Sequence, residues 1–167
     1  MRGQTASITN RGKTMVAIGD TAPDFSAPGA GDKTLALADY AGQWVVLYFY
    51  PKDDTPGCTT EAKDFTALAD QFAARNAQVL GVSKDTVKKH DKFREKHDLT
   101  VELVSDETGE ICEAYGVWVE KSMYGKTYMG IQRATFLIDP EGKLAEIWPK
   151  VKVKGHAEDV LSKIPDN

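Results

Sequence analysis

Cysteine is scarce in this chain, with Cys58 and Cys112 as the two examples among 167 residues. Two cysteines are too few for a disulfide-stapled secreted scaffold or for a four-cysteine zinc site. Long hydrophobic runs are missing as well. The longest, Trp44 to Tyr50, has seven residues, whereas a helix that spans a bilayer needs roughly 20. We therefore expect no membrane partner and a cytoplasmic location.

Positive charge is in deficit, with 21 Lys+Arg against 25 Asp+Glu and a formal net charge of −4. A nucleic-acid partner is disfavoured, because phosphate binding needs clustered positive charge. The first 14 residues depart from this balance, since they hold Arg2, Arg11 and Lys13 and no acidic residue. We expect residues 1–14 to be a disordered leader, with Met15 as an alternative start. Residues 15–167 have the composition of one globular domain.

Apolar periodicity alternates between strand and helix patterns along this domain. Continuous apolar runs predict strands, and the 3, 4, 7 spacing of apolar residues predicts helices. The predicted strands are 44–50, 78–83, 101–104, 134–139 and 143–148, and the predicted helices are 59–74, 86–97, 108–115 and 156–164. This order predicts an α/β fold with a mixed central β-sheet flanked by helices.

Other notable segments are predicted to be structural. Residues 122–130 read as a loop that lines a pocket entrance, and the alternating residues 150–154 read as a protected edge strand. His90, His97 and His156 lie on charged segments and are expected on the solvated surface. His90 and His97 would lie about 10 Å apart along a helix, too far to share a metal, so we expect no metal site.

The sharpest chemical feature is Cys58, which lies between the most buried predicted strand and an amphipathic helix. Thr55 and Pro56 fit an N-cap and a first helical position. Cys58 would then lie in the first helical turn, where free N–H groups and the helix dipole stabilise a thiolate. The alternative is that Cys58 is a small buried hydrophobic residue. The surrounding Pro, Gly and Thr residues favour a reactive cysteine.

Several cysteine chemistries do not fit this segment. Thr55 occupies the first position of a Cys-x-x-Cys pair, and Asp64 stands where a cysteine phosphatase needs an arginine. A protease-type histidine base is not indicated either. What remains is a lone thiolate with a hydroxyl three residues before it, which suits attack on a hydroperoxide.

The residues 51–58 match the pattern Pro-x-x-x-Thr-x-x-Cys, which resembles the active-site motif of peroxiredoxins. The fuller string YFYPKDDTPGCT at 48–59 is similar to the bacterioferritin-comigratory, or PrxQ-type, subfamily. Further similar segments are LGVS at 80–83, SD at 105–106, YGVW at 115–118, EKS at 120–122, YGKTY at 124–128 and RATFLID at 133–139.

The resemblance implies a thioredoxin-like fold and reduction of hydrogen peroxide and alkyl hydroperoxides by a thiol. By motif position, Cys58 would be the peroxidatic cysteine and would pass through a sulfenic acid. Thr55 would hydrogen-bond the sulfur and the peroxide, Pro51 would shield the thiolate, and Arg133 would be the distant arginine. The resemblance implies no cofactor, a role in cell redox homeostasis and, by analogy with the subfamily, a monomer.

The sequence departs from the subfamily at the resolving cysteine. Lys63 occupies the position five residues after Cys58, and the other familiar location, some three dozen residues downstream, holds no cysteine. Cys112 fits a buried helix face and is expected to be structural, with its role as a resolving cysteine as the alternative. An external thiol (thioredoxin, glutathione or a glutaredoxin) would then reduce the enzyme. A different class of function also stays open at this point, namely a non-catalytic thioredoxin-fold module for redox sensing or chaperoning.

Overall fold

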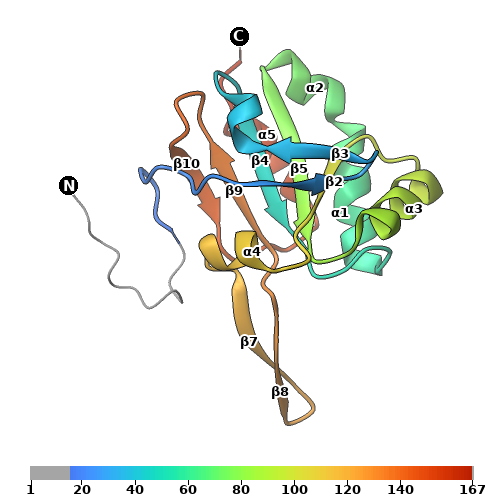
Figure 1. The fold of residues 1–167 in the computed structure, drawn as a ribbon. Coiled ribbons are helices and arrows are strands. Elements are labelled where there is room, and N and C mark those ends of the chain that lie inside the picture. The colour runs from blue at the N-terminus through green and yellow to red at the C-terminus, as the bar shows by residue number, and fades with distance from the viewer. Residues whose placement is uncertain (1–15, 167) are drawn as a thin grey trace.

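The computed structural model describes residues 16–166, so the predicted leader at 1–14 lies outside the described residues. Its centre is a seven-stranded sheet with the strand order β10-β9-β4-β5-β6-β2-β3 (Figure 1). The strands are β2 (Ser26–Gly29), β3 (Lys33–Ala36), β4 (Trp44–Phe49), β5 (Ala77–Ser83), β6 (Glu102–Ser105), β9 (Ala134–Ile138) and β10 (Leu144–Trp148). Strands β4, β5 and β6 are parallel, while β9 runs antiparallel to β4 and β10 to β9. The predicted mixed sheet is confirmed.

Strand β4 is an interior strand of the sheet, because it pairs with β5 on one side and β9 on the other. Its apolar run fits this place, since a strand covered on both faces needs apolar side chains at every position. Val45, Leu47 and Phe49 belong to one hydrophobic cluster, and Val46 and Tyr48 belong to the other. Successive side chains of a strand point to opposite faces, so the two clusters lie on opposite sides of the sheet.

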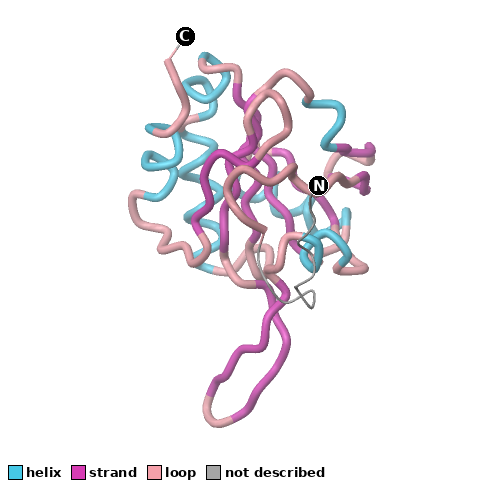
Figure 2. Tube along the Cα trace, turned by 90° about the vertical axis from the view of Figure 1, so that its left-hand side faces the viewer, coloured by secondary structure: helices cyan, strands magenta, loops and turns pink. Residues whose placement is uncertain are grey.

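Helices cover both faces of the sheet (Figures 1 and 2). The cluster with Tyr48 takes its helical residues from α1 (Pro56–Ala67), α2 (Ala69–Ala74), α3 (Val87–His97) and α5 (His156–Ser162). The opposite cluster takes its helical residues from α4 (Glu110–Ala114), and the short 3-10 helix η2 (Leu37–Tyr40) packs against it. Within residues 16–166, no helix has the length and apolar character needed to cross a bilayer.

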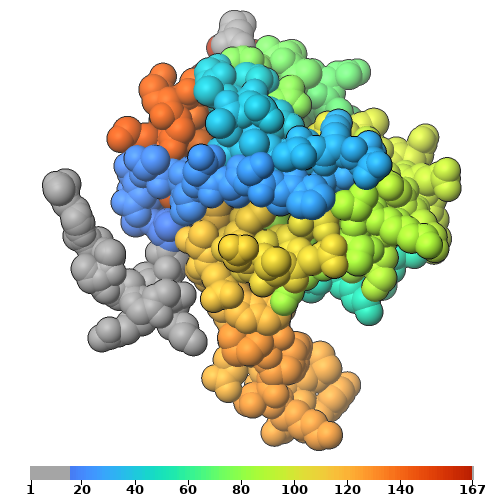
Figure 3. Space-filling model, in the orientation of Figure 1, coloured from blue at the N-terminus to red at the C-terminus, as the bar shows by residue number. Residues whose placement is uncertain are grey.

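A two-stranded hairpin, β7 (Trp118–Met123) and β8 (Lys126–Ile131), projects from the body (Figure 3). The prediction of a loop at 122–130 is therefore wrong. Tyr124 and Gly125 at its tip have φ values of 53° and 78°. A two-residue turn with positive φ at both positions matches the right-handed twist of paired strands, so it promotes a hairpin. The hairpin escaped the periodicity reading because its tip is not half-buried, with Tyr124 96% exposed.

Two further predictions need correction. The helix expected over 59–74 is two helices, which meet at Leu68 with φ −99° and ψ 8°, and the first begins already at Pro56. Residues 150–154 form no strand in the described structure, although the amide of Val151 donates to the carbonyl of Arg133. The sheet edges are β3 and β10 instead. Strands β2 and β3 were not predicted from the sequence.

Candidate active site

Cys58 lies in the first turn of α1, which follows β4 after the loop of residues 50–55. Thr55 is the N-cap residue in extended conformation, with φ −100° and ψ 156°, and Pro56 is the first helical residue. The fixed φ of proline suits this position, and its missing N–H costs no helical hydrogen bond there. Cys58 is 1% exposed. The thiol is thus buried, which fits the alternative that Cys58 is a small buried hydrophobic residue. It also lies at the positive end of the helix dipole.

Arg133 brings a positive charge to the sulfur of Cys58. It lies between β8 and β9, and its Nη2 donates to Cys58 Sγ at 3.3 Å. Its Nη1 donates to Glu61 Oε1 at 2.7 Å. The planar guanidinium therefore joins two residues of the same helix turn, a fixed geometry that a lysine ammonium does not provide. The structure thus brings Cys58 and Arg133, which are 75 residues apart in the chain, into contact.

Glu61 is a site residue that the sequence reading missed. It lies three residues after Cys58, on the same face of α1, and is 1% exposed. Burial raises its pKa to about 7, and the charge of Arg133 opposes this rise. Among residues 16–166, Glu61 Oε2 and the hydroxyl of Tyr48 are buried without a hydrogen-bond partner. An acidic residue at helical spacing from a candidate nucleophile was the signal available in the sequence.

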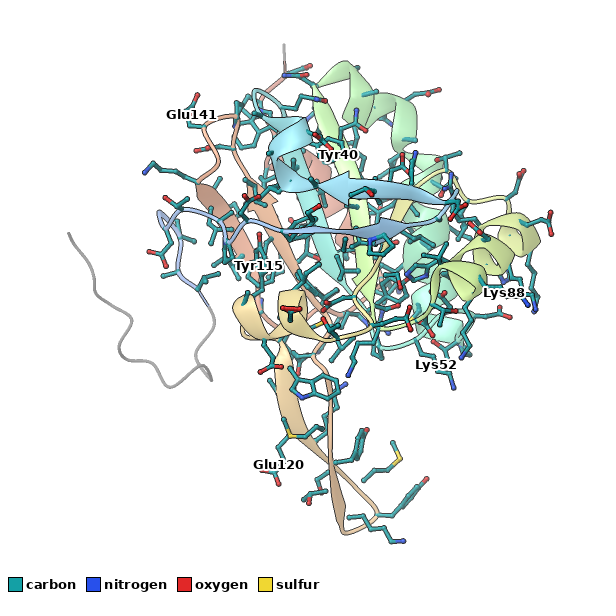
Figure 4. All side chains as sticks on the ribbon, viewed as in Figure 1. Tyr40, Lys52, Lys88, Tyr115, Glu120 and Glu141 are labelled. Carbon is teal, nitrogen blue, oxygen red and sulfur yellow. The ribbon has the colours of Figure 1, made fainter. Side chains whose placement is uncertain are left out.

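Thr55 and Pro51 flank the thiol in the loop that joins β4 to α1. The hydroxyl of Thr55 donates to the carbonyl oxygen of Lys52 at 2.8 Å, and Lys52 marks this loop in Figure 4. Because this hydroxyl has one proton, its oxygen is left to accept a hydrogen bond from another group. Thr55 is partly exposed and Pro51 is exposed, so both are accessible to solvent.

Cys112 lies on the other side of the sheet from Cys58. It belongs to the cluster of Val45, Leu47 and Phe49, whereas Cys58 belongs to the cluster of Tyr48. Cys112 is fully buried on α4, as expected for a structural cysteine. Burial and the neighbouring Asp106 carboxylate raise its thiol pKa far above the ordinary value. The sheet lies between the two thiols. A disulfide needs Cα atoms within about 7 Å, so this arrangement disfavours a bond between Cys58 and Cys112.

The prediction that all three histidines lie on the solvated surface is wrong for two of them. His156 is buried and its Nε2 lies 2.8 Å from the hydroxyl of Thr135. His90 is fully buried, with Nδ1 2.7 Å from Asp53 and Nε2 2.9 Å from the carbonyl of Val104. Periodicity could not reveal this, because each partner is distant in sequence. His90, Asp53 and Asp85 place potential ligand atoms within 4.8 Å of one another, but both ring nitrogens of His90 are already engaged.

Known proteins are similar to this chain in sequence and in architecture. The sequence model of the AhpC/TSA family matches residues 18–147. Peroxiredoxin Bcp of Bacillus subtilis (strain 168) is 50% identical over 151 residues, which are 90% of this chain and 96% of that protein. Peroxiredoxin Bcp of Escherichia coli (strain K12) is 44% identical over 144 residues, 86% of this chain and 92% of the relative.

Solved structures agree with these relatives. Peroxiredoxin Q of Xanthomonas campestris superposes with a TM-score of 0.81 at 48% identity, covering 84% of this chain and 89% of that one. The bacterioferritin comigratory protein of the same organism, described for its alkyl peroxide reduction activity, superposes with a TM-score of 0.80 at 48% identity, again over 84% and 89% of the two chains.

Proposed function

Because this chain belongs to the AhpC/TSA family and is a thiol-dependent peroxidase, a peroxiredoxin with a thioredoxin-like fold, we propose that Cys58 is its peroxide-reacting residue. The observation that carries this proposal is the 3.3 Å contact between Arg133 Nη2 and Cys58 Sγ at the start of α1. A guanidinium and a helix N-terminus both favour negative charge on the sulfur, and the thiolate is the nucleophile. Family membership argues against the non-catalytic alternative.

The first step is displacement at the O–O bond. The thiolate of Cys58 attacks the terminal oxygen of ROOH, so an S–O bond forms and the O–O bond breaks. The products are a sulfenic acid on Cys58 and RO⁻, which takes up a proton and leaves as water or an alcohol. The guanidinium of Arg133 lies where it donates to the oxygens as negative charge moves from sulfur to the leaving group.

Thr55 and Pro51 have separate roles in this proposal. The hydroxyl of Thr55 donates its proton to the carbonyl oxygen of Lys52. Its oxygen is therefore free to accept a hydrogen bond from the O–H of an incoming hydroperoxide, which orients the reacting oxygen. Pro51 shields the thiolate from bulk water at the exposed end of the loop. We take hydrogen peroxide and alkyl hydroperoxides as substrates, and the alkyl class is supported by the activity described for the Xanthomonas campestris relative.

We propose a one-cysteine cycle, because the sheet lies between Cys58 and Cys112. An external thiol attacks the sulfenic sulfur, which releases water and leaves a mixed disulfide, and a second thiol then reduces this disulfide. Thioredoxin, glutathione and a glutaredoxin are the candidate donors. The cytoplasmic location and the monomeric state stay predictions, and light scattering of the purified protein tests the second.

The test of this function compares two single variants with matched chemistry. Stopped-flow mixing with hydrogen peroxide should show that Cys58→Ser abolishes peroxide consumption, while Cys112→Ser retains the rate within about twofold, because Cys112 lies on the other side of the sheet from Cys58. Turnover is then measured with thioredoxin and with glutathione supplied separately. Full activity of Cys58→Ser would refute the assignment.

A further inference from the structure

Helix α3 holds the loop that carries Pro51 and Thr55. We call residues 50–55 the active-site loop. His90 of α3 contacts Asp53 of this loop at 2.7 Å inside the protein. Near the end of the helix, Lys96 and His97 each contact Asp54 at 2.7 Å on the surface. The buried contact is the stronger constraint, because surface ion pairs contribute little to stability.

The hydrogen bonds of His90 define its protonation. Its Nε2 lies 2.9 Å from the carbonyl oxygen of Val104, which only accepts hydrogen bonds, so Nε2 carries a proton. Its Nδ1 lies 2.7 Å from Asp53 Oδ2. The other oxygen, Asp53 Oδ1, accepts from the hydroxyl of Tyr50 at 2.6 Å, and this hydroxyl keeps its proton because burial and Asp53 raise the pKa of Tyr50 well above its ordinary value.

The charges that face the ring are negative. Asp53 and Asp85 each place a carboxylate oxygen within 4.8 Å of a ring nitrogen of His90. A carboxylate oxygen only accepts hydrogen bonds, so Nδ1, 2.7 Å from Asp53 Oδ2, also carries a proton and donates to Asp53. A cationic ring between two anions explains how these ionisable groups share one interior site.

Asp53 passes this constraint to the active-site loop. Its backbone amide donates to Asp85 Oδ2 at 2.8 Å, and the same oxygen accepts from the hydroxyl of Ser83 at 2.7 Å. The peptide that precedes the Asp53 amide contains the Lys52 carbonyl, which accepts the hydroxyl proton of Thr55. Because a peptide unit is planar, fixing the Asp53 amide also fixes the direction of the Lys52 carbonyl.

We propose that His90 is a positioning residue of the peroxidase reaction. As a doubly protonated ring it fixes Asp53, and Asp53 holds the Lys52 carbonyl that directs the Thr55 hydroxyl. The inference rests on the proposed role of Thr55 at the Cys58 thiol. On this proposal the buried contact between His90 and Asp53 has a role beyond packing, which is to keep the oxygen of Thr55 available to a hydroperoxide.

The first test measures the protonation of the ring in the unmodified protein. The chain has three histidines, so ¹⁵N NMR resolves them and the spectrum of His90→Phe assigns His90. At pH 7 both ring nitrogens of His90 should show the shifts of a protonated imidazolium. A neutral single-tautomer pattern would overturn the proposal. This measurement does not depend on peroxidase activity, so its failure differs from a failure of the proposed function.

The second test is a double-mutant cycle on the peroxide reaction. His90→Phe removes both ring donors and keeps a ring, while Thr55→Val removes the hydroxyl and keeps the shape. His90→Phe should slow the reaction of Cys58 about tenfold in the wild-type background but less than about twofold in Thr55→Val, since residues that act as a unit are not additive. Equal fold-losses in both backgrounds would show that His90 does not act through Thr55.

A control on the same helix separates positioning from general damage to α3. Lys88 is exposed on α3 (Figure 4), and Lys88→Ala should leave the rate within about 1.5-fold, as surface substitutions usually do. Asp53→Asn tests the charge itself, because its amide still hydrogen-bonds a neutral His90. A rate for Asp53→Asn equal to wild type would contradict the need for the cationic ring.

Discussion

Gly57 lies directly against the guanidinium of Arg133. A Cβ at this position would stand 3.2 Å from Nη2, the atom that contacts the sulfur of Cys58. That separation is tighter than an ordinary van der Waals contact, and the guanidinium is already held on its other side by Glu61. The absence of a side chain at Gly57 therefore makes room for the arginine at the thiol.

Gly57→Ala is predicted to separate stability from activity. Alanine favours a helix over glycine by up to about 1 kcal/mol, so the midpoint of urea unfolding should stay the same or rise. The peroxide reaction should slow about fivefold to tenfold, because displacement of an oriented donor by a few tenths of an ångström weakens transition-state stabilisation. Stopped-flow rates and unfolding curves on the same samples check this. An unchanged rate would mean that Arg133 tolerates the shift.

Arg133→Lys should lose most of the rate despite keeping its positive charge. An ammonium is a point charge and does not reproduce the fork that contacts Cys58 and Glu61 together. We expect a fall of about 10²-fold in the second-order rate with peroxide, the usual cost of losing one preorganised donor. Arg75→Lys, at an arginine that contacts the carbonyls of Leu161 and Ile164, serves as a control and should keep the rate.

Glu61→Gln should change how stability depends on pH. In the folded protein burial raises the pKa of Glu61 from 4.5 to about 7, so the folded state holds a proton that the unfolded state has lost. The contribution of Glu61 to stability is therefore greatest below pH 4.5 and is lost as the pH rises towards 7. Removing the carboxyl should abolish a decline of about 2 kcal/mol between pH 5 and pH 7.5, measured by urea unfolding at these two pH values. An identical pH profile in the variant would contradict the burial of this acid.

His156→Gln should remove a pH dependence of stability that has the opposite sign. Burial lowers the pKa of His156 from 6.5 to about 4, so between these pH values the unfolded state binds a proton that the folded state does not bind. The stability associated with the neutral ring is present above pH 6.5 and is lost as the pH falls towards 4. We expect the variant to lose about 1–2 kcal/mol less on acidification than the wild type. Thermal unfolding between pH 4 and 7 measures it, and parallel curves for both proteins would refute it.

The sequence alone was sufficient for the features that depend on local patterns. The buried strand at 44–49, the first-turn position of Cys58 and the burial of Cys112 follow from apolar periodicity and helix-start signals in neighbouring residues. The mixed sheet follows from the order of these elements.

The features that were missed depend on contacts between distant segments. His90 lies among charged residues in the sequence but is buried in the structure, where it contacts Asp53, 37 residues away. Glu61 is buried and accepts a hydrogen bond from Arg133, which is 72 residues downstream. The β7–β8 hairpin is exposed, so it lacks the half-buried alternation that marks a strand. Local periodicity carries no information on such pairs.

We propose that Cys58 reacts with the peroxide and that Cys112 does not resolve it. The most direct test treats the reduced protein with one equivalent of hydrogen peroxide in the presence of dimedone, followed by peptide mass spectrometry. We expect a dimedone adduct on Cys58, which marks its sulfenic acid, and an unmodified thiol on Cys112. An intramolecular disulfide between Cys58 and Cys112 would contradict it.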